Sequence, residues 1–378
     1  MSAISDKAVS VRAPRFGTGR EYLVGIEEEL MLVDAVSLEL APGVERVVAA
    51  IGDGRVKPEL MQCQIELATS PQVTVAAAEE ELRALRARVI GVATRSGLRL
   101  AGAGTHPFSL PESQALTMRD RYRELAAALR YPLRREVCFG MHVHVAVARP
   151  DKAIQVIEAM LPDLPLLLAL SASSPFWRGE PTGLQSTRTV VFQSLPRSGL
   201  PPVFADYEEF ACAVERLRRA GALADHSYLW WDARPHPRFG TVEVRIMDAQ
   251  PRVADSVALA GLIQSLVHHY GRRYDDGERF AEADRLVVGE NRWLAARHGL
   301  HAQLVDPEAD TCVSARRAIE QLLERVAEDA DAVEARHALD RVATLMGAGT
   351  SADRQLALHR HGASLESLVE SLVDETRG

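Results

Sequence analysis

Three separate segments of the chain alternate apolar and polar side chains, and this alternation constrains the fold more than any other feature. Successive residues of a β-strand point to opposite faces of a sheet, so each segment is expected to present one apolar and one polar row. The polar rows of segments 22–31, 137–147 and 241–247 carry, in chain order, Glu27, Glu29, His142, His144, Glu243 and Arg245. The sequence therefore predicts one sheet with a core side and a side rich in charged groups.

Three consecutive glutamates begin at Glu27 and provide an internal contrast. Glu27 and Glu29 are predicted to point to the polar face. Glu28 is predicted to lie on the other face, beside Val24 and Ile26. Any role that depends on the polar face should therefore be absent from Glu28.

Two further glutamates fit the alternation less simply. Glu59 and Glu66 are seven positions apart, so an unbroken strand would send them to opposite faces. A bulge would bring both to one face, and so would a strand that begins only after Glu59. Both explanations stay open at this stage.

The coarse pattern of the chain is α+β, with a sheet on which helices pack. Loops are expected at 197–202 and 347–351. The turn at 102–107 is expected to end a strand with His106 packed inside, and Trp230 and Trp231 are interpreted as packing residues or a pocket wall. Strands are predicted at 22–33, 61–69, 99–103, 137–147 and 241–248, and helices at 75–97, 152–173, 207–221, 253–273, 313–336 and 353–375.

Length and composition favour one catalytic domain over residues 1–378, with an N-terminal extension at about 1–19 and a helical C-terminal part at about 301–378. That helical part is expected to be a scaffold or a subunit contact, so a homodimer stays open. A net charge of −8 without a basic cluster argues against nucleic-acid binding.

Neither secretion nor membrane insertion is predicted. The first sixteen residues lack an apolar stretch, and the apolar run 161–170 is interrupted by two prolines and an aspartate. The four cysteines are widely spaced and form no metal or redox motif, which is typical of reduced thiols in the cytoplasm.

Carboxylates gathered on one face repel one another unless cations compensate them. Hard cations such as Mg²⁺ prefer carboxylate oxygens together with substrate phosphates, so the polar face predicts a metal and nucleotide site. Each pair taken alone has a simpler interpretation: Glu-x-Glu as a solvated edge, Glu-x-Arg as a cross-strand ion pair, and His142 with His144 as hydrogen-bonded rim residues or zinc ligands. No Gly-x-x-x-x-Gly-Lys-Ser/Thr loop is present, so a P-loop is not expected.

Several motifs resemble the type 2 glutamate–cysteine ligase family, and most closely its YbdK-like carboxylate-amine ligases. The resemblance extends from about residue 20 over nearly the whole chain. The motifs are GIEEEL at 25–30, QIELATSP at 64–71, GAGTHPF at 102–108, GMHVHV at 140–145, TGLQSTR at 182–188, WDARPH at 231–236, TVEVRIMD at 241–248, ENRWLAARHG at 290–299 and ADRQ at 352–355.

The resemblance implies a glutamine-synthetase-like fold, whose curved and mainly antiparallel sheet holds ATP and metal ions on its concave face. It implies Arg245, Arg234 and Arg188 as groups that bind phosphate or a substrate carboxylate, with Glu27, Glu29 and Arg245 at the nucleotide. The positions that it places around Mg²⁺, or Mn²⁺, are Glu27, Glu29, Glu59, Glu66, His142 and Glu243.

The activity implied is an ATP-dependent ligation of a carboxylate to an amine. Glutamate and cysteine are the expected substrates, γ-glutamyl phosphate the intermediate, and γ-glutamylcysteine, ADP and phosphate the products; in this branch the activity on cysteine is expected to be weak, and another acid or amine is an alternative. Two other functions stay open. One is an amidohydrolase-like zinc hydrolase that uses His142 and His144, and the other is a nucleotide-binding regulator without catalysis.

Overall fold

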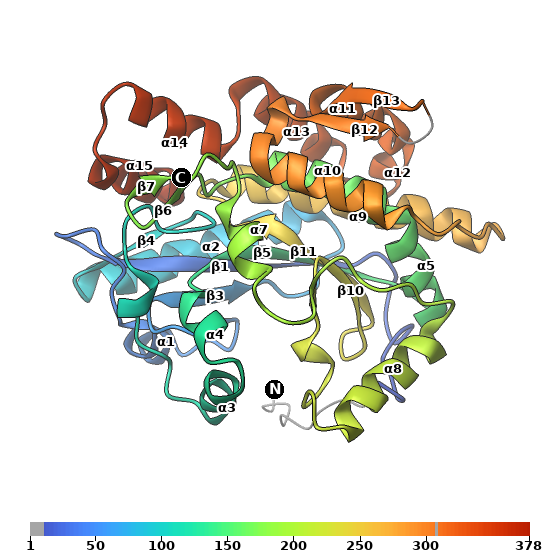
Figure 1. Ribbon diagram of the computed structural model, residues 1–378, viewed down its shortest axis with the longest axis horizontal. Coiled ribbons are helices and arrows are strands. Elements are labelled where there is room, and N and C mark those ends of the chain that lie inside the picture. The colour runs from blue at the N-terminus through green and yellow to red at the C-terminus, as the bar shows by residue number, and fades with distance from the viewer. Residues whose placement is uncertain (1–10, 307–308) are drawn as a thin grey trace.

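A mainly antiparallel sheet forms the middle of the molecule (Figure 1). The computed structural model describes residues 11–306 and 309–378. Within them, the largest sheet has seven strands in the order β10-β11-β5-β1-β3-β2, with β4 pairing to the far end of β1. The strands are β1 (Val24–Asp34), β2 (Val56–Pro58), β3 (Gln64–Ala68), β4 (Leu98–Ala101), β5 (Gly140–Ala146), β10 (Ala233–His236) and β11 (Thr241–Asp248).

Helices cover one face of this sheet, above β1 in Figure 1. The even-numbered residues at the start of β1, such as Val24 and Ile26, are fully buried there together with Met141, Val143 and Val244. The covering helices are α2 (Val75–Arg95), α5 (Pro150–Met160), α6 (Leu164–Ser171), α9 (Val253–Asp275) and α13 (Arg336–Ala348). The alternation in the sequence thus correctly identified the core side.

Other elements stand around the opposite face. In Figure 1, α3 and α4 lie below the sheet on one side, and α8 lies below it on the other. Short elements in this layer and at its rim are α1 (Val44–Ile51), α3 (Asp120–Leu129), α4 (Tyr131–Arg135), α7 (Thr187–Phe192), β8 (Ser198–Gly199), α8 (Tyr207–Arg219) and β9 (Trp230–Trp231). Small hairpins and single turns complete it, namely β6 (Phe176–Trp177), β7 (Glu180–Pro181), η1 (Pro111–Ser113) and η3 (His226–Tyr228).

The C-terminal third differs from the sequence prediction. The expected helix at 313–336 is divided: its first two residues belong to β13, and two shorter helices, α11 and α12, cover most of the rest. Ser314 caps α11, and Thr350 caps α14 in a reciprocal capping box with Asp353. The elements are α10 (Arg285–His298), η4 (Gly299–His301), β12 (Gln303–Asp306), β13 (Thr311–Ser314), α11 (Ala315–Arg325), α12 (Ala327–Ala332), α14 (Ser351–Arg360) and α15 (Leu365–Arg377).

Two other long helices are also divided. The predicted helix 152–173 breaks into α5 and α6 around a 3₁₀ turn, η2 (Leu161–Asp163), where two prolines remove backbone donors. The predicted helix 353–375 breaks at Gly362, whose φ of 89° is a left-handed conformation that ends a helix. Hydrophobic spacing alone did not reveal these breaks, because the apolar face continues across each of them.

The stretch Pro150–Ser171 is long and apolar enough to cross a membrane by composition. It corresponds to α5 and α6, and 78% of its apolar window is buried inside the protein. The prolines interrupt it as the sequence indicated, and its side chains belong to the core between the sheet and the helices that cover it.

The expected N-terminal extension, 1–19, is partly outside the described residues, which begin at Val11. The described part packs on the body of the protein. Val11 is buried against α8, and the backbone N–H groups of Arg15 and Gly17 donate to the carbonyls of Pro237 and Val147. Residues 11–19 therefore form part of the layer over the polar face.

Candidate active site

The strand register brings the predicted polar residues together. On β1, Glu27 lies opposite His142 of β5. Glu29 of β1 lies opposite Glu66 of β3. On the other side of β5, Glu243 of β11 lies opposite His144. These partners come from strands far apart in the sequence, and the antiparallel pairing places them on one face.

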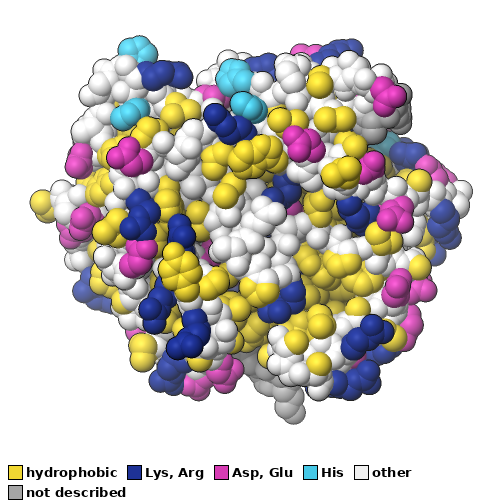
Figure 2. Space-filling model, viewed as in Figure 1, with side chains coloured by type: hydrophobic (Ala, Val, Ile, Leu, Met, Phe, Trp, Pro, Cys, Tyr) yellow, Lys and Arg dark blue, Asp and Glu magenta, His cyan; other side chains and the backbone are white. Residues whose placement is uncertain are grey.

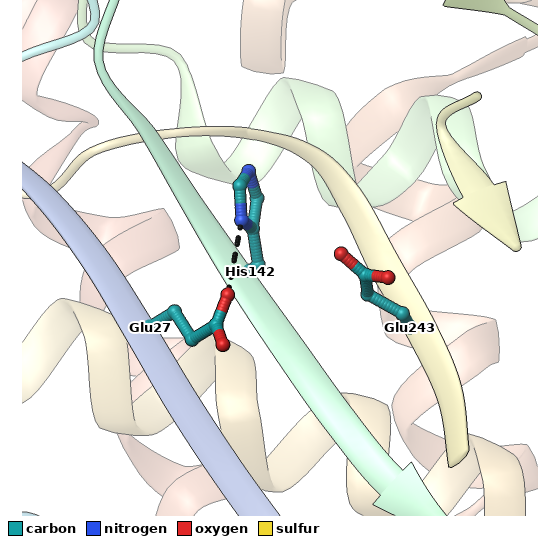
Figure 3. A group of neighbouring side chains, drawn as sticks. All are labelled: Glu27, His142 and Glu243. Carbon is teal, nitrogen blue, oxygen red and sulfur yellow. Dashed lines mark ion pairs between the residues drawn. The ribbon is translucent and has the colours of Figure 1, made fainter. Parts of the chain in front are cut away.

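Glu27, His142 and Glu243 form one compact group (Figure 3). One possible ligand atom from each lies within 4.8 Å of the other two. His142 Nδ1 is 3.5 Å from Glu27 Oε2. His142 Nε2 is buried and has no hydrogen-bond partner, which is unusual for a buried polar atom and makes it a candidate contact for a ligand or an ion.

A second group consists of Glu29, Glu59 and Glu66. β3 begins at Gln64 and Glu59 follows β2, so the late-strand explanation holds and the bulge explanation does not. Burial raises the pKa of Glu59 well above its usual value, and the charges of Glu66 and Glu29 raise it further. Lys57 Nζ donates to Glu66 Oε1 at 2.8 Å, which neutralises only part of this negative charge.

Glu28 lies on the other side of β1 as the alternation predicts. Its carboxylate is fully buried, where it accepts from Arg86 Nε at 2.8 Å, from Arg86 Nη2 at 2.7 Å and from Ser256 Oγ at 2.5 Å. Arg86 belongs to α2 and Ser256 to α9. This ion pair attaches the covering helices to the sheet, away from the polar face.

Histidines and arginines hold the first group ionised. Burial by itself would raise the pKa of Glu27, but His144 and His142 hold it well below the usual value. Burial would likewise lower the pKa of His144, yet Glu27 and then Glu243 raise it. The polar face therefore carries Glu27 as a carboxylate, the form that binds cations.

Glu243 anchors two arginines. Arg234 Nε donates to Glu243 Oε2 at 2.6 Å, and Arg245 Nη1 donates to Glu243 Oε1 at 2.5 Å. Burial would raise the pKa of Glu243, but these two guanidinium groups hold it well below its usual value. Arg245 also keeps a buried Nε without a partner, so its guanidinium has donor capacity left for an anionic ligand.

A bulge in β11 presents Arg245. The register against β5 shifts between Val244 and Met247, so Arg245 and Ile246 together oppose His142. The carbonyls of Arg245 and Ile246 accept from Arg188 Nη2 and Nη1, each at 3.2 Å. Both Nη groups of Arg188 are thus engaged by the backbone of the bulge, and its buried Nε has no hydrogen-bond partner.

Gly140 makes room for that guanidinium. A Cβ atom on Gly140 would lie 2.3 Å from Arg188 Nη2, a distance that atoms do not adopt. The backbone N–H of Gly140 also donates to Glu29 Oε2 at 2.6 Å. A side chain at this position would disturb both the support of the bulge and the setting of Glu29.

A cavity of about 320 Å³ opens beside Glu27 at the Gly25 end of the polar face. Phe239 lines it and stacks on His236, with ring centroids 4.4 Å apart and planes 12° apart. Lys57 and the segment Arg15–Arg20 lie on its other walls. The cavity therefore combines an aromatic surface, cations and an adjacent carboxylate–imidazole group.

Sequence reasoning missed these cavity residues and also Glu136. Residues 15–20 carry no periodic pattern, and only the tertiary structure brings them over β1 and β5. Glu136 is buried just before β5; burial and the charge of Glu29 raise its pKa to about 8. Its position next to the GMHVHV motif was the only signal in the sequence, and it is not specific.

Comparison with known proteins identifies the family. Residues 23–374 match the family model described as glutamate-cysteine ligase family 2. The chain belongs to glutamate–cysteine ligase family 2. A Rubrobacter xylanophilus protein named "Putative glutamate--cysteine ligase 2-3" is 42% identical over 366 residues, covering 96% of this chain and 99% of that protein. A Ruegeria pomeroyi protein with a name of the same kind is 40% identical over 366 residues, covering 94% and 95% of the two chains.

Solved structures agree on the fold of this family 2 protein. Glutamate–cysteine ligase from Francisella tularensis, in complex with AMP, superposes with a TM-score of 0.68 at 14% identity, covering 94% of this chain and 89% of that one. A bifunctional glutathione synthetase from Pasteurella multocida gives 0.67 at 16% identity, covering 94% and 52%. The α+β fold of the glutamine-synthetase type expected from the sequence is confirmed.

Family membership makes the protein a carboxylate–amine ligase of the glutamate–cysteine ligase type that acts on small molecules. The alternative of an amidohydrolase-like zinc hydrolase loses its structural basis, since those enzymes carry their ligands at the ends of parallel barrel strands and the large sheet here is antiparallel.

Proposed function

We propose that this protein joins a carboxylate to an amine at the expense of ATP. The carboxylate oxygen of the acid attacks the γ-phosphorus of ATP, and ADP leaves with the electrons of the broken P–O bond. The amine nitrogen then attacks the acyl carbon, inorganic phosphate leaves, and the amine loses a proton. The sequence contains no P-loop motif, so in this proposal binding and charge compensation come from the polar face of the sheet.

The observation that carries this proposal is the cavity beside the Glu27–His142–Glu243 group. Its volume, its Phe239 surface and its cations Lys57 and Arg20 fit an adenine nucleotide that lies with its phosphates toward Glu27. The AMP bound to the Francisella enzyme supports a nucleotide as the ligand. On the face shown in Figure 2, by contrast, basic and acidic side chains are interspersed as on an ordinary solvated surface.

The residues fit a hard divalent cation. Carboxylates with an imidazole are a donor set for Mg²⁺ or Mn²⁺, and the buried His142 Nε2 lacks a protein partner. Glu27, His142 and Glu243 would hold one ion, and Glu29, Glu59 and Glu66 a second. Bound Mg²⁺ would neutralise the phosphates of ATP and the developing charge on the oxygen that leaves.

The arginines divide into two roles. Arg245 lies beside His142 and keeps donor capacity, so we assign it to the γ-phosphate. Arg234 is fully engaged by Glu243 and by the carbonyls of Ser227 and Leu229, so we assign it to holding Glu243 in place. The sequence had suggested Arg234 and Arg188 as substrate-binding groups. In this proposal Arg234 instead supports Glu243, and Arg188 supports the β11 bulge.

Glutamate and cysteine are the proposed substrates, with weak formation of γ-glutamylcysteine through γ-glutamyl phosphate. The names of the relatives support this pair, and another acid or amine stays open. We further propose that the chain forms one catalytic domain and acts in the cytoplasm. A homodimer stays a prediction. The described cysteines are free, which agrees with a reducing compartment.

ADP release tests the proposal. Purified protein with ATP and Mg²⁺ is screened against amino acids and amines, and products are identified by mass spectrometry. ADP release that needs both an acid and an amine, with an amide product, is expected. An amide with an amine other than cysteine would change the substrate and keep the reaction. No ADP release with any pair, from protein that binds ATP, would contradict the proposal.

A further inference from the structure

Arg197 is a half-buried cation without an acidic partner among the described residues. Its Nε donates to the carbonyl of Tyr228 at 3.0 Å, and its guanidinium lies 5.5 Å from the ring centroid of Trp230. Burial lowers the pKa of Arg197, and no carboxylate raises it. The two Nη groups of this arginine therefore keep their donors, whereas Arg188 and Arg234 spend theirs on the protein.

The backbone at Arg197 is held in a costly conformation. Its φ of 62° lies in the left-handed region, which side chains larger than glycine rarely adopt. Pairing with β9 maintains this conformation, because Trp230 N–H donates to Arg197 O at 2.9 Å and Ser198 pairs with Trp230. Strain of this kind, where the surroundings fix it, is a recognised property of ligand-binding residues.

One short loop, residues 227–229, connects Arg197 to the Glu27–His142–Glu243 group. Arg197 binds the carbonyl of Tyr228, while Arg234 Nη1 binds the carbonyls on either side, those of Ser227 and Leu229, at 3.1 and 2.5 Å. Arg234 in turn binds Glu243. Arg197 and Arg234 therefore bind adjacent carbonyls of the same loop, and Arg234 in turn holds Glu243 of the Glu27–His142–Glu243 group.

The same loop is reached from α3 on the other side of the polar face. Arg121 donates to Ser227 Oγ at 2.9 Å and lies 5.1 Å from the Tyr228 ring centroid. Its neighbour Tyr122 is close to the second carboxylate group: burial raises the Tyr122 pKa, and the charges of Glu59 and Glu66 raise it further. A rim with cations and aromatic rings thus borders the carboxylate groups.

This rim is separate from the nucleotide cavity. The rim residues Arg121, Arg197, Tyr228 and Trp230 are not among the residues that line the cavity beside Glu27. A ligand on the rim and a nucleotide in the cavity therefore do not compete for the same lining residues.

We propose that Arg197 binds the unreacted carboxylate of an amino-acid substrate, stacked in position by Trp230. The inference rests on the proposed ligase function and names a substrate group for the same site. A guanidinium with free Nη donors offers a planar fork that matches a carboxylate, and an aromatic ring beneath it fixes the plane of the fork. The carboxylate belongs either to the acid that is phosphorylated at its other end or to the amine.

Decarboxylated analogues distinguish the two sources. Glutamate is compared with 4-aminobutyrate, which keeps the reacting carboxyl group, and cysteine is compared with cysteamine. The variant Arg197→Gly suits the left-handed backbone and so keeps the fold, while Arg197→Lys keeps the charge without the fork. Arg216→Gln, at an exposed position of α8, is the matched control.

The expected result is a loss of preference for the carboxylate. In Arg197→Gly, kcat/KM for one amino acid should fall by roughly 10- to 100-fold, mainly through KM, with kcat/KM for its analogue unchanged. The kcat/KM of Arg197→Lys for the same amino acid should lie between those of Arg197→Gly and the wild type, and the kcat/KM of Arg216→Gln should equal that of the wild type. Whichever pair changes identifies the source of the carboxylate.

Equal losses for an amino acid and its analogue, or no loss in any pair, would overturn the inference while the ligase function stands. If the wild type releases no ADP at all, calorimetric binding of glutamate and cysteine in the presence of ATP and Mg²⁺ replaces turnover. Binding that is lost in Arg197→Gly then keeps the inference although the proposed function fails. Equal binding by both proteins, or none by the wild type, overturns it.

Discussion

Substitution of the adjacent glutamates Glu27 and Glu28 should separate catalysis from stability. Glu28→Gln keeps the shape of a fully buried side chain but removes the charge that faces Arg86, which is 2% exposed. The amide can still accept one hydrogen bond from Arg86, yet its NH₂ group is placed against guanidinium donors. The substitution therefore leaves a buried cation without compensation.

The structure gives a magnitude for this loss. Removal of one partner from a buried ion pair costs roughly 3–5 kcal/mol, and the acceptor that remains favours the lower end. Unfolding entropy of roughly 2.1 cal/mol/K per residue gives about 0.8 kcal/mol/K for this chain of 378 residues. A loss of about 3 kcal/mol then lowers the melting temperature by about 4 °C. Turnover per folded molecule should not change.

Glu27→Gln should behave in the opposite way. It removes a carboxylate that faces His142 and His144 on the polar face, so turnover should fall by roughly a hundredfold or more, with little change in melting temperature. ADP release and thermal unfolding are measured on both variants. Equal losses of turnover in the two variants, with folding intact, would refute the assignment of opposite faces, and an unchanged melting temperature for Glu28→Gln would refute the buried ion pair.

Three further predictions follow from other parts of the structure. Gly140→Ala should displace Arg188 and with it the β11 bulge, so turnover should fall by roughly tenfold or more. Gly91→Ala on α2 is the control, because a Cβ atom there lies 3.7 Å from its nearest neighbour, and it should leave turnover unchanged. The rate of ADP release is measured for both variants. Buried His106 has a pKa of about 4, because burial outweighs its bond to the Leu38 carbonyl, whereas the unfolded chain binds a proton near pH 6.5. This residue's contribution to stability is therefore full above pH 6.5, falls as the pH drops from 6.5 to 4 by up to about 3 kcal/mol, and falls no further below pH 4; His106→Gln should lack this slope in urea unfolding. Exhaustive EDTA treatment should abolish ADP release, and Mg²⁺ or Mn²⁺, but not zinc alone, should restore it; full activity without added metal would contradict the proposed donor set.

The central part of the fold could be predicted from the sequence because strand alternation is a local property. The polar and apolar rows of β1, β5 and β11 follow from a period of two, and the contacts of Glu28 agree with it. The bulge at Arg245 could not be predicted in the same way. It depends on Arg188 and Gly140, which come from other segments and meet β11 only in the folded protein.

The helix boundaries and the surroundings of the site were harder to predict from the sequence. Apolar spacing continues through the turn at Gly362 and through the prolines between α5 and α6, so it suggested single long helices. Arg197 lay in a segment interpreted as a surface loop, since its left-handed backbone is not visible in the order of residues. That conformation is held by the pairing of β8 with β9, whose strands are far apart in the sequence.

The central position of β1 has a consequence for how the chain reaches its native state. One edge of β1 pairs with β3, which follows soon after it. On the other edge, β4 pairs with residues 31–34, but residues 24–28 pair with β5, which is synthesised much later. Contacts between distant segments form slowly, so this edge stays open for part of folding, and an open strand edge is a template for self-association. The charges of Glu27 and Glu29 on that strand repel a second copy of it. The carboxylates of the site should thus also protect newly made protein from aggregation, and a chain that lacks both would refold with a lower yield at high concentration.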